Sequence, residues 1–102
     1  MRFLNFHNIK YIHDKDCLDF LNKMRPDFYL PGYNLIIEYD GVQHFKPLKF
    51  FGGEEKLRER QKNDELKKQL CEENGIEVIK IPYWEYNNIE KILEERFYGN
   101  DK

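Results

Sequence analysis

The fold of this chain is decided by residues 25–40, which read RPDFYLPGYNLIIEYD. Two runs rich in aromatic and β-branched residues, 25–30 and 34–39, are separated by a turn that contains a Pro-Gly pair. This pattern predicts an antiparallel β-hairpin. The apolar run of its second strand continues directly into Glu38 and Asp40. Because alternate residues of a strand point to the same face, we expect both carboxylates on one face of the sheet.

A long helix is predicted downstream, over residues 54–74. Two glutamates open it, where they suit the positive end of the helix dipole, and Asn74-Gly75 supplies the left-handed stop. We expect its buried stripe to include Leu66 and Leu70. The stop leads into residues 76–82, whose apolar residues predict a short strand in or near the core.

The two ends of the chain differ in how clearly they predict structure. Apolar residues recur at helical spacing from Ile89 to Phe97, behind a candidate cap at Asn87 or Asn88, so we expect a final amphipathic helix packed on the sheet. Residues 1–24 fit either helix or strand, and the pattern leaves that segment open.

Length and composition indicate one domain spanning residues 1–102. Hydrophobic residues make up 40% of the 102 and aromatic residues 16%, which is too apolar for a disordered chain. No run approaches the length of a membrane span, and two cysteines are too few for a disulfide framework, so an intracellular protein of the cytoplasm, nucleus or nucleoid is expected. With a formal charge of -2, any contact with nucleic acid must be local.

The acids of the hairpin indicate a cation site. Glu38 and Asp40 repel each other unless they reach solvent or bind a cation, and oxygen ligands at this spacing suit Mg²⁺ or Mn²⁺. Asp27 on the partner strand could add a third oxygen. The alternative is that the two acids mark a solvent-facing strand end.

Two residues beyond the hairpin could complete such a site. His44 follows Asp40 by four positions and is suited to general acid or base chemistry near neutral pH, although an isolated loop histidine is more often a surface residue. Asp64 lies in the long helix, where its simplest partner is Arg60, one turn earlier, in an exposed pair worth about 0.3–0.5 kcal/mol.

The ordered combination of these segments resembles the PD-(D/E)xK nucleases, which have a restriction-endonuclease-like fold. The resemblance rests on Arg-Pro-Asp-Phe at 25–28, Ile-Glu-Tyr-Asp-Gly at 37–41 and Gln-His-Phe at 43–45, and it extends to about Trp84. The very-short-patch-repair endonucleases and related homing endonucleases are the most similar branch, because their later part also carries an Arg-x-Arg-x-x-x-Asp helix, a glycine stop and an apolar strand.

The resemblance implies a Mg²⁺-dependent (or Mn²⁺-dependent) deoxyribonuclease of mixed α/β fold, with a β-hairpin that carries the acidic site and helices that flank the sheet. Asp27, Glu38 and Asp40 would be metal ligands, His44 would assist proton transfer and Asp64 would complete or orient the site. The implied partner is DNA, with RNA open, and the small size allows a homodimer. Candidate nucleic-acid contacts are Arg25, Gln43, Lys46, Lys49, Arg58 and Arg60.

The chain departs from the family pattern in two places. The standard motif has Lys where this chain has Asp40, as the patch-repair branch permits, and the stretch before Ile9 lacks the acid that related nucleases often carry in their first helix. Two other functions therefore compete with the enzyme. One is a catalytically silent nuclease-like module for nucleic-acid binding or assembly, and the other is an unrelated binding protein whose acidic hairpin is surface.

Overall fold

The computed structural model describes residues 2–15, 17–21, 25–47, 49 and 52–99. It is a mixed α/β fold in which helices flank one four-stranded sheet, as the sequence predicts. In chain order the elements, with η for a 3-10 helix, are α1 (Arg2–Phe6), β1 (Ile12–His13), η1 (Asp19–Leu21), β2 (Phe28–Leu30), η2 (Pro31–Tyr33), β3 (Leu35–Asp40), η3 (Val42–His44), α2 (Gly53–Glu73), β4 (Glu77–Pro82), η5 (Tyr83–Asn88) and α3 (Ile89–Tyr98).

The sheet has the strand order β1-β2-β3-β4. The predicted hairpin is confirmed, since β2 and β3 pair antiparallel with Phe28 opposite Ile37, and η2 with a left-handed Asn34 makes the turn. β4 then pairs parallel to β3, with Glu38 opposite Lys80. Because parallel neighbours need a crossover, the chain between them must leave the sheet, and it does so as α2.

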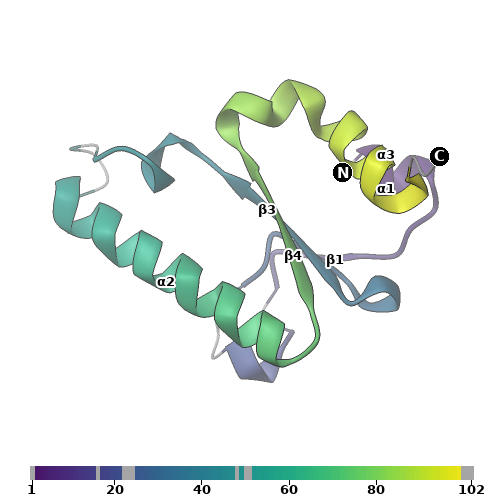
Figure 1. Cartoon of the computed structure of the whole chain (residues 1–102), viewed down its shortest axis with the longest axis horizontal. Coiled ribbons are helices and arrows are strands. Elements are labelled where there is room, and N and C mark those ends of the chain that lie inside the picture. The colour runs from purple at the N-terminus through teal and green to yellow at the C-terminus, as the bar shows by residue number, and fades with distance from the viewer. Residues whose placement is uncertain (1, 16, 22–24, 48, 50–51, 100–102) are drawn as a thin grey trace.

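The two faces of the sheet are covered by different helices (Figure 1). α2 lies along one face, and α1 and α3 pack together on the other, where both ends of the chain also lie. The larger core fills the second interface and consists of Phe3, Leu4, Ile9, Phe28, Leu30, Leu35, Ile37, Ile81 and Leu93. The smaller core lies under α2 and consists of Leu21, Ile36, Cys71 and Ile76.

The ends of α2 follow from local sequence. Gly52 precedes it with φ +90°, and Gly75 follows it with φ +74°, a left-handed conformation that glycine adopts at low cost. After this stop the Ile76 amide donates to the Cys71 carbonyl at 2.8 Å, which satisfies a carbonyl of the last turn. The predicted buried stripe is wrong for Leu66, whose side chain is 46% exposed.

The C-terminal helix is confirmed as α3, which buries Leu93. Asn88 occupies the cap position, but its side chain donates to Glu85 and makes no hydrogen bond to the helix N-terminus. The described part of the segment that the sequence left open forms α1, the short edge strand β1 and η1. Among the described residues, none of the helices has the length and apolar character required to cross a lipid bilayer.

Candidate metal centre

β3 carries two carboxylates into the interior. Its residues alternate between faces, so Ile36, Glu38 and Asp40 point to the side covered by α2. Glu38 and Asp40 are only 5% and 4% exposed. Burying a carboxylate costs several kcal/mol unless charged or hydrogen-bonding partners compensate, so the partners of these two acids define what the site can do.

Glu38 is compensated by a lysine from α2. Lys67 Nζ lies 3.0 Å from Glu38 Oε1, and the Asp27 amide donates to Glu38 Oε2 at 3.2 Å. Burial raises the pKa of Glu38 above its usual value; the Lys67 ammonium opposes that rise and the charge of Asp27 adds to it. This pair is nearly enclosed, with side chains 14% and 7% exposed.

Asp27 lies beside Glu38 at the start of β2. Its Oδ2 accepts a hydrogen bond of 2.7 Å from the Tyr39 amide, so its side chain continues the ladder between β2 and β3 where the regular pairing ends. The charge of Asp27 also contributes to a raised pKa of Tyr39, for which burial is the larger cause. The half-buried Asp27 therefore holds the hairpin end and adds negative charge to it.

Asp40 faces a different set of groups. Lys80, from the neighbouring strand β4, places Nζ 3.3 Å from Asp40 Oδ2 and 3.8 Å from Asp64 Oδ2. His44 Nδ1 is 3.9 Å from Asp40 Oδ1 and 2.8 Å from Asp64 Oδ2. A carboxylate can only accept, so His44 donates through Nδ1, and Asp64 thereby orients the ring and leaves Nε2 for other chemistry.

Asp40, His44 and Asp64 form a group with metal-ligand chemistry. One ligand atom from each lies within 4.8 Å of the other two. Two carboxylate oxygens and an imidazole nitrogen are a donor set for a divalent cation, and the nitrogen favours transition metals over magnesium. A pocket of about 260 Å³ opens beside the group, and its lining also includes Phe45 and Gln61.

The structure thus brings together three of the five predicted site residues, with His44 and Asp64 in the places that the prediction gave to two other metal ligands. Of the predicted ligands Asp27, Glu38 and Asp40, only Asp40 belongs to this group, while the other two bond to Tyr39 and Lys67. The predicted face of Glu38 and Asp40 is confirmed.

Two lysines of the candidate site, Lys67 and Lys80, were not predicted from the sequence. Lys80 stands between Ile79 and Ile81 in a strand, at a position that faces α2, and this placement is the signal that could have found it. Lys67 follows Asp64 by three positions, so both lie on one face of α2. Together these lysines neutralise the acids of β3, a solution that the reasoning from charge repulsion omitted.

The predicted nucleic-acid contacts are spread over the molecule. Arg25 precedes β2, Lys46 and Lys49 follow η3, and Arg58 lies in the first half of α2, all with exposed side chains. Arg60 is half-buried, and the side chain of Gln43 lies outside what the structure describes.

Comparison with known proteins identifies a family. A family described as "Protein of unknown function (DUF2726)" matches residues 7–96. This span includes the hairpin, α2, β4 and most of α3, and therefore the whole candidate metal centre. The chain gives no significant match to any solved structure.

Three similar proteins come from two invertebrate iridescent viruses and from Frog virus 3. Uncharacterized protein 307L of Invertebrate iridescent virus 6 is 34% identical over 61% of this chain and 42% of its own length. Uncharacterized protein 033L of Invertebrate iridescent virus 3 is 38% identical over 61% of this chain and 32% of its own length. Uncharacterized protein 094L of Frog virus 3 is 36% identical over 56% of this chain and 38% of its own length. The match thus spans less than half of each relative.

Proposed function

This chain belongs to the DUF2726 family of proteins of unknown function, and we propose from the geometry of its site that it is a metal-dependent endonuclease that hydrolyses phosphodiester bonds in DNA. The observation that carries the proposal is the convergence of Asp40, His44 and Asp64 within 4.8 Å at the end of a buried strand. Nothing in the packing of the core requires two acids and a histidine at that place. A few convergent polar groups beside a pocket are typical of functional sites.

The donor set fits Mg²⁺ or Mn²⁺, with Mn²⁺ favoured by the imidazole. A divalent cation bound there supplies Lewis-acid chemistry, which activates water and stabilises charge on phosphate oxygens. Asp40 would be the anchoring ligand, because it belongs to β3 and the parallel pairing with β4 extends to it, opposite Pro82. Asp64 would hold the ring of His44, and Lys80, whose side chain is one-third exposed, would turn from Asp40 toward a phosphate oxygen.

The arrangement of elements supports the same proposal. A hairpin with Asp27 on one strand and Glu38 and Asp40 on the other, followed by a helix and a parallel strand, is the order that the resemblance to PD-(D/E)xK nucleases implies. We therefore propose a restriction-endonuclease-like core. In it, Glu38 and its partner Lys67 would set the charge beside the metal, and Asp27 would hold the hairpin end.

The test varies the metal ion, the DNA substrate and the carboxylates of the site. Purified protein is incubated with labelled single-stranded, duplex and branched DNA in Mg²⁺, Mn²⁺ or EDTA, beside the variants Asp40→Asn and Asp64→Asn. Asp19→Asn is the matched control, because Asp19 is exposed in η1. We expect cleavage that EDTA abolishes and that only the first two variants lose. Equal residual cleavage in all three variants would contradict the proposal. RNA substrates and the oligomeric state are measured in the same experiments.

A second function has its own supporting observation. Lys67 and Lys80 already neutralise Glu38 and Asp40, so the acids are compensated without a metal. A catalytically silent nuclease-like module for nucleic-acid binding or assembly would keep these lysine–carboxylate ion pairs and bind no metal. It predicts DNA binding that EDTA leaves unchanged, no cleavage under any condition, and no binding of Mn²⁺ by electron paramagnetic resonance.

A further inference from the structure

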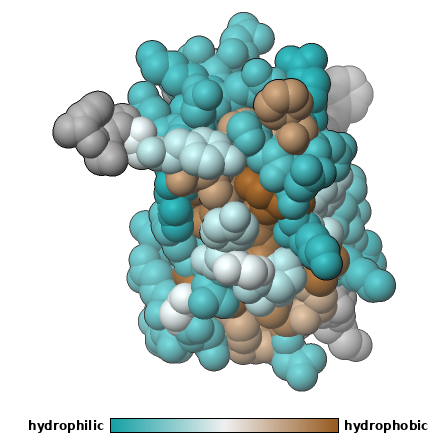
Figure 2. Space-filling view, turned by 90° about the vertical axis from the view of Figure 1, so that its right-hand side faces the viewer, coloured by the Kyte–Doolittle hydropathy of each residue, from teal (hydrophilic) through white to brown (hydrophobic). Residues whose placement is uncertain are grey.

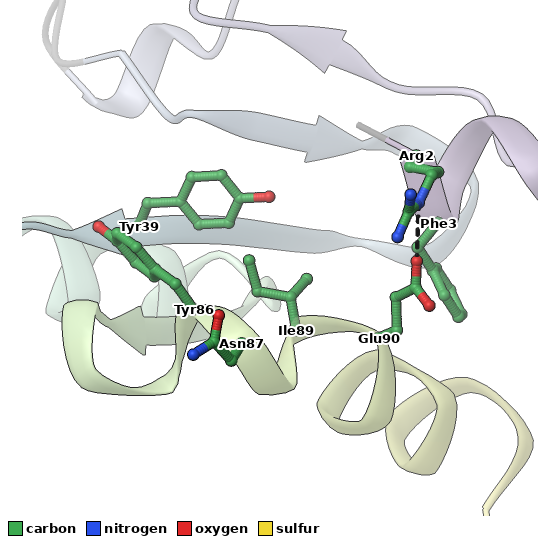
Figure 3. Close-up of a pocket in the computed structure, with 7 residues that line it drawn as sticks. All are labelled: Arg2, Phe3, Tyr39, Tyr86, Asn87, Ile89 and Glu90. Carbon is green, nitrogen blue, oxygen red and sulfur yellow. Dashed lines mark hydrogen bonds and ion pairs between the residues drawn. The ribbon is translucent and has the colours of Figure 1, made fainter.

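A second pocket lies on the opposite face of the sheet from α2. It has a volume of about 440 Å³, and residues of β3, η5, α1 and α3 line it. Figure 3 shows Tyr39 reaching along the strand toward Arg2, Tyr86 and Asn87 entering from η5, and Ile89 on the floor between them. In Figure 2, which views the side that carries α1 and α3, apolar and weakly polar side chains gather in a central band framed by hydrophilic ones.

This pocket and the metal centre meet through consecutive residues of β3: Tyr39 lines the pocket, and Asp40, on the opposite face, belongs to the metal centre. Tyr86 is 40% exposed, yet the charges of Asp40 and Asp27 contribute to a raised pKa of its hydroxyl, after burial as the larger cause. The Tyr39 amide donates directly to Asp27. The Tyr86 ring lies 5.7 Å from the Tyr39 ring between centroids, so Tyr86 lines the pocket beside the last residues of β3.

The chemistry of the walls indicates what the pocket can hold. The rings of Tyr39 and Tyr86 are 5.7 Å apart between centroids and inclined at 56°, so a flat group can stack on one ring and meet the edge of the other. The Asn87 amide both donates and accepts hydrogen bonds, as the edge of a nucleobase requires. Arg2 pairs with Glu90 at 3.0 Å in an exposed contact, which a phosphate can displace at little cost.

We propose that this pocket receives one nucleobase of an unpaired nucleotide, with Tyr86 as the stacking surface and Asn87 at the base edge. The proposal rests on the proposed function in one respect, since it places the neighbouring phosphate at the Asp40 cluster. It adds the class of substrate: DNA with a single-stranded or extruded base. A base inside an intact duplex cannot enter such a pocket without being unstacked and unpaired.

The test measures base-dependent binding apart from cleavage. The probes are a short oligodeoxythymidine and an abasic oligomer of the same length, both titrated in EDTA by fluorescence anisotropy. We expect the thymidine probe to bind about 5- to 150-fold more tightly, the range that stacking of one base on an aromatic side chain supplies. Tyr86→Leu should abolish this preference, and Tyr86→Phe, which keeps the ring, should retain it.

The control is Tyr98→Leu, which removes an exposed tyrosine outside the pocket and should leave the preference unchanged. Equal binding of the two probes by the unaltered protein, or a preference that survives Tyr86→Leu, would overturn the inference. The nuclease proposal fails separately. If no substrate is cleaved but the base preference depends on Tyr86, the nucleobase pocket is supported and the nuclease proposal is contradicted. If duplex DNA is cleaved but the protein shows no base preference, the nuclease proposal is supported and the nucleobase pocket is contradicted.

Discussion

The buried ion pair between Lys67 and Glu38 allows a quantitative test of how the acids of β3 are held. Lys67→Met removes the ammonium and keeps most of the side-chain volume. At the 3.0 Å separation of the pair, Coulomb's law with an effective dielectric of about 20 gives an attraction of roughly 5.5 kcal/mol. The variant no longer incurs the cost of desolvating the ammonium, which offsets part of the lost attraction. We therefore expect the free energy of unfolding to fall by about 3–5 kcal/mol near neutral pH.

The deficit should depend on pH in a definite direction. Burial already raises the pKa of Glu38, and losing the Lys67 charge raises it further. The folded variant then binds a proton at a pH where the unfolded chain does not, so its stability falls as pH rises through that window. The deficit relative to the unaltered protein is therefore largest above the raised pKa and shrinks as pH falls toward 4.5, the ordinary value for Glu.

Urea denaturation at about pH 5 and about pH 7.5 measures both effects. The double variant Glu38→Gln with Lys67→Met should recover most of the stability at the higher pH, because it removes both charges of this buried pair together. Lys62→Met, at an exposed position of the same helix, should stay within about 0.5 kcal/mol of the unaltered protein. A Lys67→Met deficit below about 0.5 kcal/mol, or one that is the same at both pH values, would refute this account of the pair.

Three other substitutions or measurements test separate features. Lys80→Met removes the cation that competes for Asp40, so Mn²⁺ should bind about tenfold more tightly by paramagnetic resonance titration; unchanged or weaker binding contradicts the metal site. Gly75→Ala should lower the free energy of unfolding by about 1–2 kcal/mol, because φ is +74° and no atom lies within 4 Å of the new Cβ to add a clash. Cys71 is fully buried, and burial raises the pKa of its thiol. In a Cys17→Ser background, Ellman's reagent should therefore label Cys71 only after unfolding, and rapid labelling of the folded protein would disprove its enclosure.

The sequence by itself determined the elements whose signals are local. The hairpin follows from two runs rich in aromatic and β-branched residues and from the Pro31-Gly32 turn between them, and the end of α2 follows from Gly75, which can adopt a positive φ without strain. The common face of Glu38 and Asp40 follows from the period of a strand alone. Each of these features depends on neighbours within a few residues, so pattern and backbone sterics suffice to predict it.

Only the tertiary structure decided which groups meet at the site. His44 and Asp64 are 20 residues apart, and they meet because α2 crosses back over the face that carries Asp40. Lys80 reaches the same acid because β4 pairs parallel to β3 in one register, and a shift by one residue would turn it to the other face. Leu66 shows the same dependence, since its apolar character predicted burial and the line along which α2 contacts the sheet leaves it exposed. Partners across such distances are selected by packing and charge compensation, which depend on the whole fold and leave no periodic signal in the chain.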